Sequence, residues 1–441
     1  MKKQISAMWN LLGDIIGIVT SRERLKQKLS VSLYRNAIYL MIGTAINSIF
    51  GLAFWVVATR WLYEPEDVGL ASAVMSAIML LGLFATLGLD YAVIRFLPNS
   101  GEKTNAMVNT CLSIGGLTSI IMALIFMAGL GLWSPALLFL RQNPVYIISF
   151  IVFTMCYTIY LIQSRTFIAM RRADFSLAQN IVFNLLRFPF LFILAVFSTV
   201  FGIYASWGIG LMVALVIGAL VFQPRVKPGY RPVPQIERQV VNELIPYSFA
   251  NYISALLWSA PGFILPVMVV NLAGAEANAY FFIAWAIAGV LFAVPVGITF
   301  SLFAEGSHDE KKLGADTRRS LILILVILIP GILLSILLGH EVLSFFSPVY
   351  AENATRVLWV LALSAVPLSL NYIYSGVKRV EMKMESVICL NAFITITTIA
   401  LSWILLPRMG IMGAGVAWLA SQSIAALVVI VLWLPKIRRA F

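Results

Sequence analysis

Twelve long apolar stretches dominate this sequence and limit what it can fold into. Each runs for roughly 20 residues with few charged side chains, the length an α-helix needs to cross the hydrocarbon core of a bilayer. Of the 441 residues, 61% are hydrophobic and only 11% are charged. A soluble fold of this size would lack the polar side chains to cover its surface. The sequence therefore predicts an all-α integral membrane protein and excludes a water-soluble enzyme.

The apolar stretches fall into two sets of six, separated by a polar connector with four prolines. The candidate spans are residues 36–59, 69–94, 107–132, 145–163, 177–197, 203–222, 246–271, 279–303, 320–338, 357–376, 386–406 and 412–434. We expect an N-terminal six-helix lobe at 31–222, a cytoplasmic linker at 223–243 and a C-terminal six-helix lobe at 244–441.

The first 30 residues have a different character. Five apolar side chains share one helical face there, and four cations follow them. A signal peptide is one interpretation, but the segment lacks a small-residue cleavage site. We expect an interfacial amphipathic helix over residues 1–30.

Lysine and arginine positions indicate how the spans are oriented. Of the 31 lysine and arginine residues, 26 lie near span ends on the side of the membrane that holds the N-terminus. Four lie on the opposite side, and Arg187 lies within a span. Cations near span ends are retained on the cytoplasmic side. The sequence predicts a multi-pass protein of the cytoplasmic (inner) membrane with both termini in the cytoplasm. The net charge of +12 therefore indicates the membrane surface and not nucleic acid.

The two halves also align weakly with each other. Glu66 matches Glu276, and Asn184 matches Asn391, at offsets of 210 and 207 residues. Apolar helices align to one another easily, so chance similarity is the alternative interpretation. Six spans per half return the chain to its starting side, which predicts two parallel, pseudo-symmetric repeats around a midplane cavity.

The sequence offers no catalytic constellation. Its two histidines, His308 and His340, lie in loops on opposite sides, so no histidine base or metal cluster is expected. Cys111, Cys156 and Cys389 all fall in apolar runs, which favours small core residues over a disulfide or zinc framework. The longest external loop, residues 339–356, leaves no room for an enzymatic ectodomain. We expect neither an enzyme nor a cofactor.

Arg187 is the clearest charged residue inside a span. Asn180, Asn184 and Arg187 follow a helical i, i+4, i+7 spacing and so share one face. A charge at the bilayer centre costs roughly 2.5 to 3.5 kcal/mol on insertion scales. The three residues are candidates for substrate binding, and the alternative is an arginine that extends to the cytoplasmic surface.

Two further polar stripes lie on the first helices of the two lobes. Their members are Arg35, Asn36, Gly43 and Asn47 in the first lobe, and Tyr247, Asn251, Ser254 and Trp258 in the second. Amides and aromatic rings suit sugar hydroxyls and pyranose faces, although asparagine and serine also join helices by hydrogen bonds. Arg35, Asn47, Tyr247, Asn251 and Trp258 are substrate-binding candidates.

Asp90 is the one acid well inside a predicted span. Arg95 follows five residues later, which places the two about 140° apart on a helix and disfavours an ion pair within it. Asp90 is a candidate for ion coupling, with sugar binding and a hydrogen bond to a neighbouring helix as alternatives. Arg95 joins the candidates for substrate binding.

Two sequence runs resemble a known family. Residues 61–71 read WLYEPEDVGLA and residues 87–98 read LGLDYAVIRFLP. Together they resemble the start of polysaccharide-biosynthesis flippases of the multidrug/oligosaccharidyl-lipid/polysaccharide exporter superfamily, and residues 31–434 fit its pattern of twelve spans. The chain differs at Glu64, where a glycine is common.

The resemblance implies a V-shaped, MATE-like pair of lobes that alternates between inward-open and outward-open forms. The implied substrate is a polyprenyl-pyrophosphate-linked oligosaccharide, moved from the cytoplasmic to the outer leaflet for surface polysaccharides such as lipopolysaccharide O-antigen. Membrane lipid, a glycan polymerase and glycosyltransferases are the implied partners. The residues agree with this, because the cations Arg35, Arg95 and Arg187 suit a pyrophosphate.

Two alternatives stay open. A drug/cation antiporter of the same superfamily would favour embedded carboxylates, and the spans offer only Asp90. A non-transporting scaffold of a glycan-assembly complex would leave the buried arginine and asparagine stripes unexplained.

Overall fold

The computed structural model describes residues 32–196, 200–308 and 313–440, and the predicted amphipathic segment at 1–30 lies outside them. Every regular element in these residues is helical. The long helices are α3 (Ser32–Val57), α4 (Pro65–Ala85), α6 (Thr104–Ala128), α8 (Pro144–Ala169), α9 (Ala173–Ala195), α10 (Val200–Ile217), α12 (Arg238–Leu272), α13 (Ala275–His308), α14 (Leu313–Leu337), α16 (Pro348–Val380), α17 (Met384–Met409) and α18 (Ile411–Ala440).

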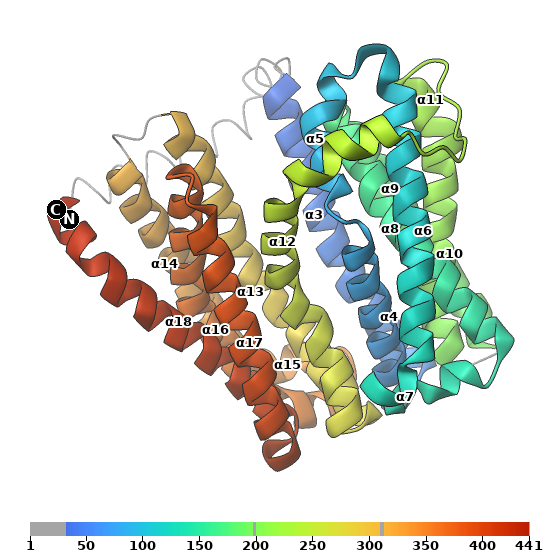
Figure 1. Cartoon of the computed structure of the whole chain (residues 1–441). Helices are drawn as coiled ribbons and strands as arrows, with labels where there is room; N and C mark the ends of the chain where they lie inside the picture. The colour runs from blue at the N-terminus through green and yellow to red at the C-terminus, as the bar shows by residue number, and fades with distance from the viewer. Residues whose placement is uncertain (1–31, 197–199, 309–312, 441) are drawn as a thin grey trace, which may run out of the picture.

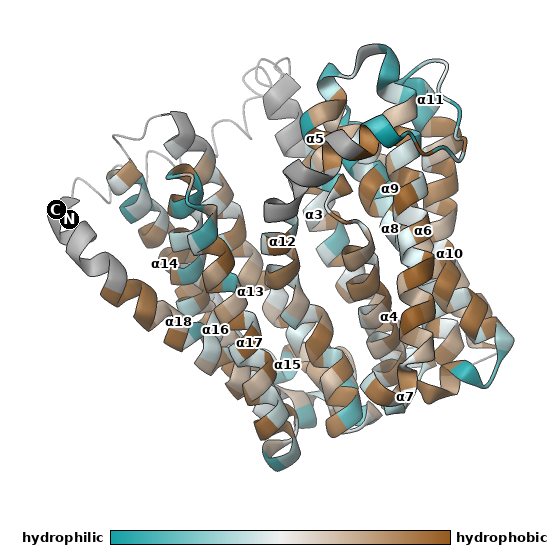
Figure 2. Ribbon diagram, in the orientation of Figure 1, coloured by the Kyte–Doolittle hydropathy of each residue, from teal (hydrophilic) through white to brown (hydrophobic). Residues whose placement is uncertain are grey.

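The predicted twelve spans are confirmed. Twelve helices in the described residues are long and apolar enough to cross a membrane. Figure 2 shows hydrophobic residues along the lengths of these helices and hydrophilic residues mainly near their ends. The chain is a multi-pass membrane protein, because a helix satisfies its own backbone hydrogen bonds inside lipid and twelve of these helices have the length and apolar composition to span it.

The prediction that residues 69–94 form one continuous spanning helix is wrong. α4 ends at Ala85, and a short helix, α5 (Leu89–Phe96), starts after a break. At the break, Leu87 and Gly88 have φ angles of 48° and 77°. These left-handed conformations cannot continue an α-helix, and glycine adopts them without steric cost.

The predicted external loop at 339–356 is also wrong. It contains α15 (Gly339–Ser344), and α16 begins at Pro348, nine residues before the predicted span. The Ser347 hydroxyl accepts a hydrogen bond from the Val349 backbone N–H, and Pro348 occupies the first turn. This cap and proline are favourable at a helix start, so the helix extends beyond its apolar part.

The cysteines differ in environment. Cys111 and Cys156 are buried as predicted, but Cys389 is exposed on α17. The prediction of a core position for Cys389 is therefore wrong. An apolar side chain on a membrane helix can face lipid as readily as protein, so an apolar run does not identify its buried face.

Two six-helix lobes lie side by side and are closest at one end (Figure 1). The first contains α3 to α10 and the second α12 to α18. Matching contacts support the pseudo-symmetry: Asn184 in α9 donates to Asn47 in α3 at 2.5 Å, and Asn391 in α17 donates to the Ser254 carbonyl in α12 at 3.2 Å. Both pairs are 137 residues apart in the chain. Each therefore joins the first and fifth spanning helices of its lobe.

The lobes join tightly at the end that carries α15, which we call the seam end. Asn278 of α13 donates to the Gly69 carbonyl of α4 at 2.7 Å and to Ser72 Oγ at 3.1 Å. Arg60 donates to the Ser344 carbonyl at 2.8 Å. A Cβ atom added at Gly69 would lie 1.7 Å from the Ala275 carbonyl oxygen, so only glycine permits this approach.

The opposite end, which we call the connector end, carries the segment between the lobes. After α11 (Gln223–Val226) the chain runs without regular structure to residue 237 and lies against α6. Asn109 donates to the Arg231 carbonyl at 3.0 Å and accepts from Tyr230 Oη at 2.8 Å. Burial raises the pKa of Tyr230 to about 12, so its hydroxyl stays protonated and can donate. The two lobes splay apart towards this end in Figure 1.

Candidate functional site

A chain of amides joins three helices of the first lobe. Asn180 Oδ1 accepts hydrogen bonds from Tyr160 Oη of α8 and from Asn47 Nδ2 of α3, the latter at 3.4 Å. Asn184 Nδ2 donates to Asn47 Oδ1 at 2.5 Å, and Asn184 Oδ1 has no partner. Asn47 is exposed whereas Asn184 is buried, so the network reaches from the lobe surface into its interior. The structure thus brings together three of the predicted substrate-binding residues.

Arg187 lies one to two turns further along α9, in an aromatic environment. Its guanidinium carbon is 5.0 Å from the ring centre of Phe54, 5.3 Å from Phe183 and 5.8 Å from Phe188. The side chain is 6% exposed, and its Nε and Nη2 have no hydrogen-bond partner among the residues that the structure describes. Cation–π attraction of about 0.5 to 2 kcal/mol per ring offsets part of the desolvation cost. Arg187 is a buried cation whose donors are available to an anion.

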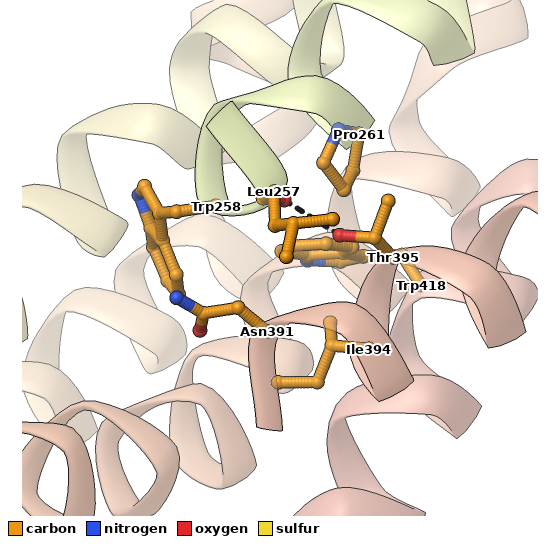
Figure 3. A pocket seen from close by; sticks show the side chains of 7 residues that line it. All are labelled: Leu257, Trp258, Pro261, Asn391, Ile394, Thr395 and Trp418. Atoms are coloured by element: carbon orange, nitrogen blue, oxygen red, sulfur yellow. Dashed lines mark hydrogen bonds between the residues drawn. The ribbon is translucent and has the colours of Figure 1, made fainter. Parts of the chain in front are cut away.

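Trp258 lines a small pocket in the second lobe, between α12, α17 and α18 (Figure 3). The pocket includes Asn391, Thr395 and Trp418, and its side chains leave no room for a water molecule. Asn391 Oδ1 and Trp418 Nε1 are buried without partners, while Thr395 Oγ1 donates to the Leu257 carbonyl at 2.6 Å. The Trp258 ring packs on Tyr372, with ring centres 4.1 Å apart. Trp258 therefore belongs to the interior of its lobe and is only partly accessible.

One arginine from each lobe lies within electrostatic range of the same tyrosine, Tyr91. Arg165 of α8 and Arg379 of α16 both act electrostatically on the phenol of Tyr91 in α5. Both arginines are partly buried, and Arg379 Nε has no hydrogen-bond partner. The charge of one arginine from each lobe thus influences this tyrosine.

Asp90, next to Tyr91, is the acid of this region. Its carboxylate is 6% exposed, and Arg165 is the cation that acts on it. Arg95 is exposed at the end of α5, whereas Asp90 is buried. Among the described residues, the buried charged side chains are Asp90, Arg187 and Lys378, so bases exceed acids.

Lys378 is paired at the connector end of α16. Its Nζ donates to Glu381 Oε2 at 2.6 Å, and Lys383 Nζ donates to the same oxygen at 3.1 Å. Burial alone would raise the pKa of Glu381, but these two ammonium groups hold the pKa below its ordinary value. Lys378 is therefore neutralised locally, whereas Arg379 beside it is not engaged by this carboxylate.

Three predicted site residues lie where the structure does not describe side chains. Arg35 falls in the first turn of α3, and Tyr247 and Asn251 fall in α12. Their roles stay predictions. The sequence did not identify Arg165 and Arg379 as site candidates. Both were assigned to connecting loops, where they served only to indicate the orientation of the spans. α8 extends to Ala169, so Arg165 lies inside a spanning helix. A prediction with a longer fourth span would have included Arg165.

No group of three or more histidine, cysteine, aspartate or glutamate side chains in the described residues could hold a metal ion. The buried guanidinium of Arg187, with Nε and Nη2 unpartnered among the described residues, favours anion recognition.

Comparison with known proteins identifies the family. The family model described as polysaccharide biosynthesis protein matches residues 33–304, which is more than half of the chain. The MatE model matches residues 251–404. One similar relative is the probable flippase AglR of Haloferax volcanii, 28% identical over 156 residues. That match covers 34% of this chain and 33% of the relative, so it spans about a third of each.

Solved structures share the fold at low sequence identity. The lipid II flippase MurJ in an inward closed conformation has a TM-score of 0.72 at 12% identity, covering 89% of this chain and 87% of MurJ. An inward-facing multidrug resistance MATE family transporter has a TM-score of 0.68 at 16% identity, covering 92% and 98%. The predicted two-lobed, MATE-like fold is confirmed. The resemblance seen at residues 61–71 and 87–98 is confirmed too, because both runs lie inside the matched region: this chain belongs to the polysaccharide biosynthesis protein family.

Proposed function

We propose that this protein is a flippase for a polyprenyl-pyrophosphate-linked oligosaccharide. In this proposal the connector end faces the cytoplasm, and the substrate moves to the outer leaflet by alternating access of the two lobes for surface polysaccharide biosynthesis. The cell membrane is its expected location. Glycosyltransferases that make the lipid-linked glycan, and a polymerase that consumes it, are its expected partners. Family membership and the name of the probable flippase AglR support a flippase, and the name of the lipid II flippase MurJ supports a lipid-linked substrate.

The family match over residues 33–304 is the observation that carries the proposal, and Arg165 and Arg379 support it. Each belongs to a different lobe, and both act on Tyr91. Guanidinium groups bind phosphate oxygens in a bidentate manner, and such charge-assisted bonds are about twice as strong as neutral ones. A pyrophosphate at this point would interact with both lobes at once, which is what couples substrate binding to their relative movement.

The glycan and the lipid have different requirements. In our proposal Asn47, Asn180 and Asn184 offer amide groups for sugar hydroxyls, and the exposed Asn47 is where the substrate first meets this network. Arg187 supplies a second, deeper cation. The polyprenyl tail stays in lipid beside the lobes.

A drug/cation antiporter is the second candidate, and the MatE match over residues 251–404 is the observation that favours it. A cationic substrate needs embedded carboxylates. Among the described residues, Asp90 is the single buried acid, and Arg187 is the buried base that forms no ion pair there, since Lys378 is paired with Glu381. This balance favours an anionic substrate. A scaffold without transport is a third hypothesis, and it assigns no use to the buried arginine.

Reconstitution into vesicles tests the proposal. The purified protein is placed in liposomes with a fluorescent oligosaccharide on polyprenyl pyrophosphate, and a membrane-impermeant quencher reports the fraction in each leaflet. We expect rapid exchange of this lipid, at least tenfold slower exchange after Arg165→Gln or Arg379→Gln, and little change after Arg172→Gln. Arg172 is the matched control because it forms a half-exposed pair with Asp174 at 2.8 Å.

Two results would contradict the proposal. One is transport of a cationic dye without exchange of the pyrophosphate lipid, which would identify the antiporter. The other is equal exchange of the same glycan carried on an uncharged polyprenol, which would show that the arginines do not recognise pyrophosphate.

A further inference from the structure

The end of α3 reaches across the seam end to the second lobe. There the chain winds into a π-helix, η1 (Ala58–Leu62), a widened turn that often occurs at functional sites. The buried Thr59 hydroxyl donates to the Phe346 carbonyl at 3.2 Å and also to a carbonyl of its own helix. Beside it, Arg60 bonds to the carbonyl of Ser344, the last residue of α15. Such terminal carbonyls lack a partner within their helix, so the first lobe caps a helix of the second.

The end of α12 makes the reciprocal contact. Asn271 Nδ2 donates to Ser134 Oγ at 2.9 Å, and its Oδ1 accepts from the Ala136 backbone N–H at 3.0 Å. Ser134 and Ala136 lie at the junction of α7 (Leu130–Trp133) and a 3-10 helix, η4 (Pro135–Arg141). The second lobe thus holds a short helical segment of the first.

The internal repeat relates these two contacts. Asn278 and Gly69, which bond across the seam end, are 209 residues apart. Shifting η1 by 209 residues gives 267–271, the end of α12, and shifting α15 back by the same number gives 130–135, the junction of α7 and η4. In a two-fold arrangement a contact between matching residues lies on the axis, and a contact away from the axis occurs twice. Figure 1 shows α7 and α15 at the same end of the molecule.

We propose that the two contacts form a reciprocal latch that keeps the outer side of the protein closed. The inference rests on the proposed function for its orientation, in which the seam end faces outwards. It goes beyond that function because it names the contacts that have to separate before the outward-open form appears. The latch residues are Thr59, Arg60, Ser344 and Phe346 in one contact, and Ser134, Ala136 and Asn271 in the other.

Arg60 and Asn271 hold the latch by different chemistry. A cation that bonds to a carbonyl at the end of a helix is favourable, but Arg60 is exposed, so water replaces its partner at little cost. Asn271 is partly buried and satisfies both a donor and an acceptor of the other lobe. We therefore expect Asn271 to contribute more to closure than Arg60.

The labelling rate of one cysteine measures the opening. The reporter is Ser72→Cys in a background with the native cysteines replaced, because Ser72 is buried and its hydroxyl accepts a bond from Asn278 across the seam end. A membrane-impermeant maleimide is added to right-side-out or inside-out membrane vesicles. In right-side-out vesicles we expect labelling to be about fivefold faster with Asn271→Leu and about twofold faster with Arg60→Met.

Matched controls and a double variant sharpen this test. Asn353→Leu and Arg141→Met should label at the unmodified rate, since both side chains bond to carbonyls of their own lobe. If the two contacts restrain one opening, their effects multiply, so Asn271→Leu/Arg60→Met should label about tenfold faster. Arg60→Lys keeps a cation and should restore slow labelling.

Crosslinking tests whether the latch has to release during transport. In Arg60→Cys/Ser344→Cys, a short bismaleimide joins the lobes at the first contact and should stop exchange of the pyrophosphate lipid. A linker with a reducible disulfide should allow exchange again after reduction. In Arg141→Cys/Ala128→Cys the same linker stays within the first lobe, where Arg141 bonds to the Ala128 carbonyl, and should leave exchange unchanged.

The outcomes separate the latch from the proposed function. Unchanged labelling in Asn271→Leu, in Arg60→Met and in the double variant would overturn the latch, as would full exchange by the crosslinked protein. Faster labelling in inside-out vesicles alone would overturn it too, because the seam end would then face the cytoplasm. If the latch variants label faster as expected but the protein exchanges no pyrophosphate lipid, the latch stands and the proposed function fails.

Discussion

The hydroxyl group of Tyr252 in α12 donates a 2.7 Å hydrogen bond to the carbonyl oxygen of Phe84 in α4. The bond joins the second lobe to the first at the last turn of α4. Inside the first lobe, Thr118 Oγ1 donates to the neighbouring Ala85 carbonyl, also at 2.7 Å. Two side chains thus add hydrogen bonds to carbonyl groups at the break, where the regular α-helical pattern of α4 ends.

Tyr252→Phe removes this link between the lobes. A hydrogen bond contributes about 1 kcal/mol net, so we expect a lower melting temperature of the purified protein. Tyr350→Phe is the control, because the Tyr350 hydroxyl is buried without a partner and its loss should not lower stability. Equal melting temperatures for wild type and Tyr252→Phe would show that the contact carries no stabilising free energy.

Gly69→Ala should open the seam end. The new Cβ would meet the Ala275 carbonyl oxygen, and such overpacking costs about 1 to 3 kcal/mol. In a background with the native cysteines replaced, Ser72→Cys reports opening through its labelling rate with a membrane-impermeant maleimide. We expect faster labelling with Gly69→Ala than with Gly51→Ala, since a Cβ at Gly51 meets no atom within 4 Å. A maleimide rate that is the same in both backgrounds would contradict the tight seam.

Arg187→Met separates transport from folding. Methionine fills the aromatic environment without a charge, and replacing a buried, unpaired charge by an apolar side chain is often neutral or stabilising. We expect an unchanged or raised melting temperature together with loss of lipid exchange. Normal exchange by the folded variant would remove Arg187 from the substrate site.

Glu381 should make stability dependent on acid pH. Its pKa is lower in the folded protein than its ordinary value, so the unfolded chain binds the proton more readily. The stabilisation is present above the unfolded pKa of about 4.5 and is lost as the pH falls through the folded value. Melting curves from pH 7 to pH 3 should therefore show a steeper decline for wild type than for Glu381→Gln. Parallel declines would mean that Lys378 and Lys383 do not stabilise the carboxylate.

The spanning helices could be predicted because each one must carry an uninterrupted apolar surface, which is a local property of the sequence. The break in the second span could not. Leu87 and Gly88 sit in an apolar run, and a glycine inside such a run is compatible with a continuous helix. Only the observed φ angles reveal that the chain turns there.

The candidate site was predictable in part for the same reason. Asn180 and Asn184 share a face by local spacing, and their contact with Asn47 follows from the packing of α3 on α9. Arg165 and Arg379 lie more than 200 residues apart, and their convergence on Tyr91 depends on how two lobes are placed. Spacing along the chain contains no information about that placement.

Hydrogen bonds from α6 hold the segment between the lobes against that helix. Besides Asn109, Ser113 Oγ accepts from the Gln235 backbone N–H at 3.0 Å, and Thr110 Oγ1 accepts from the Glu237 backbone N–H at 3.1 Å. The second lobe therefore begins at a point fixed to the first, directly before α12. If one lobe rocks against the other, α12 itself has to bend, because the connector before it is held against α6 by these hydrogen bonds.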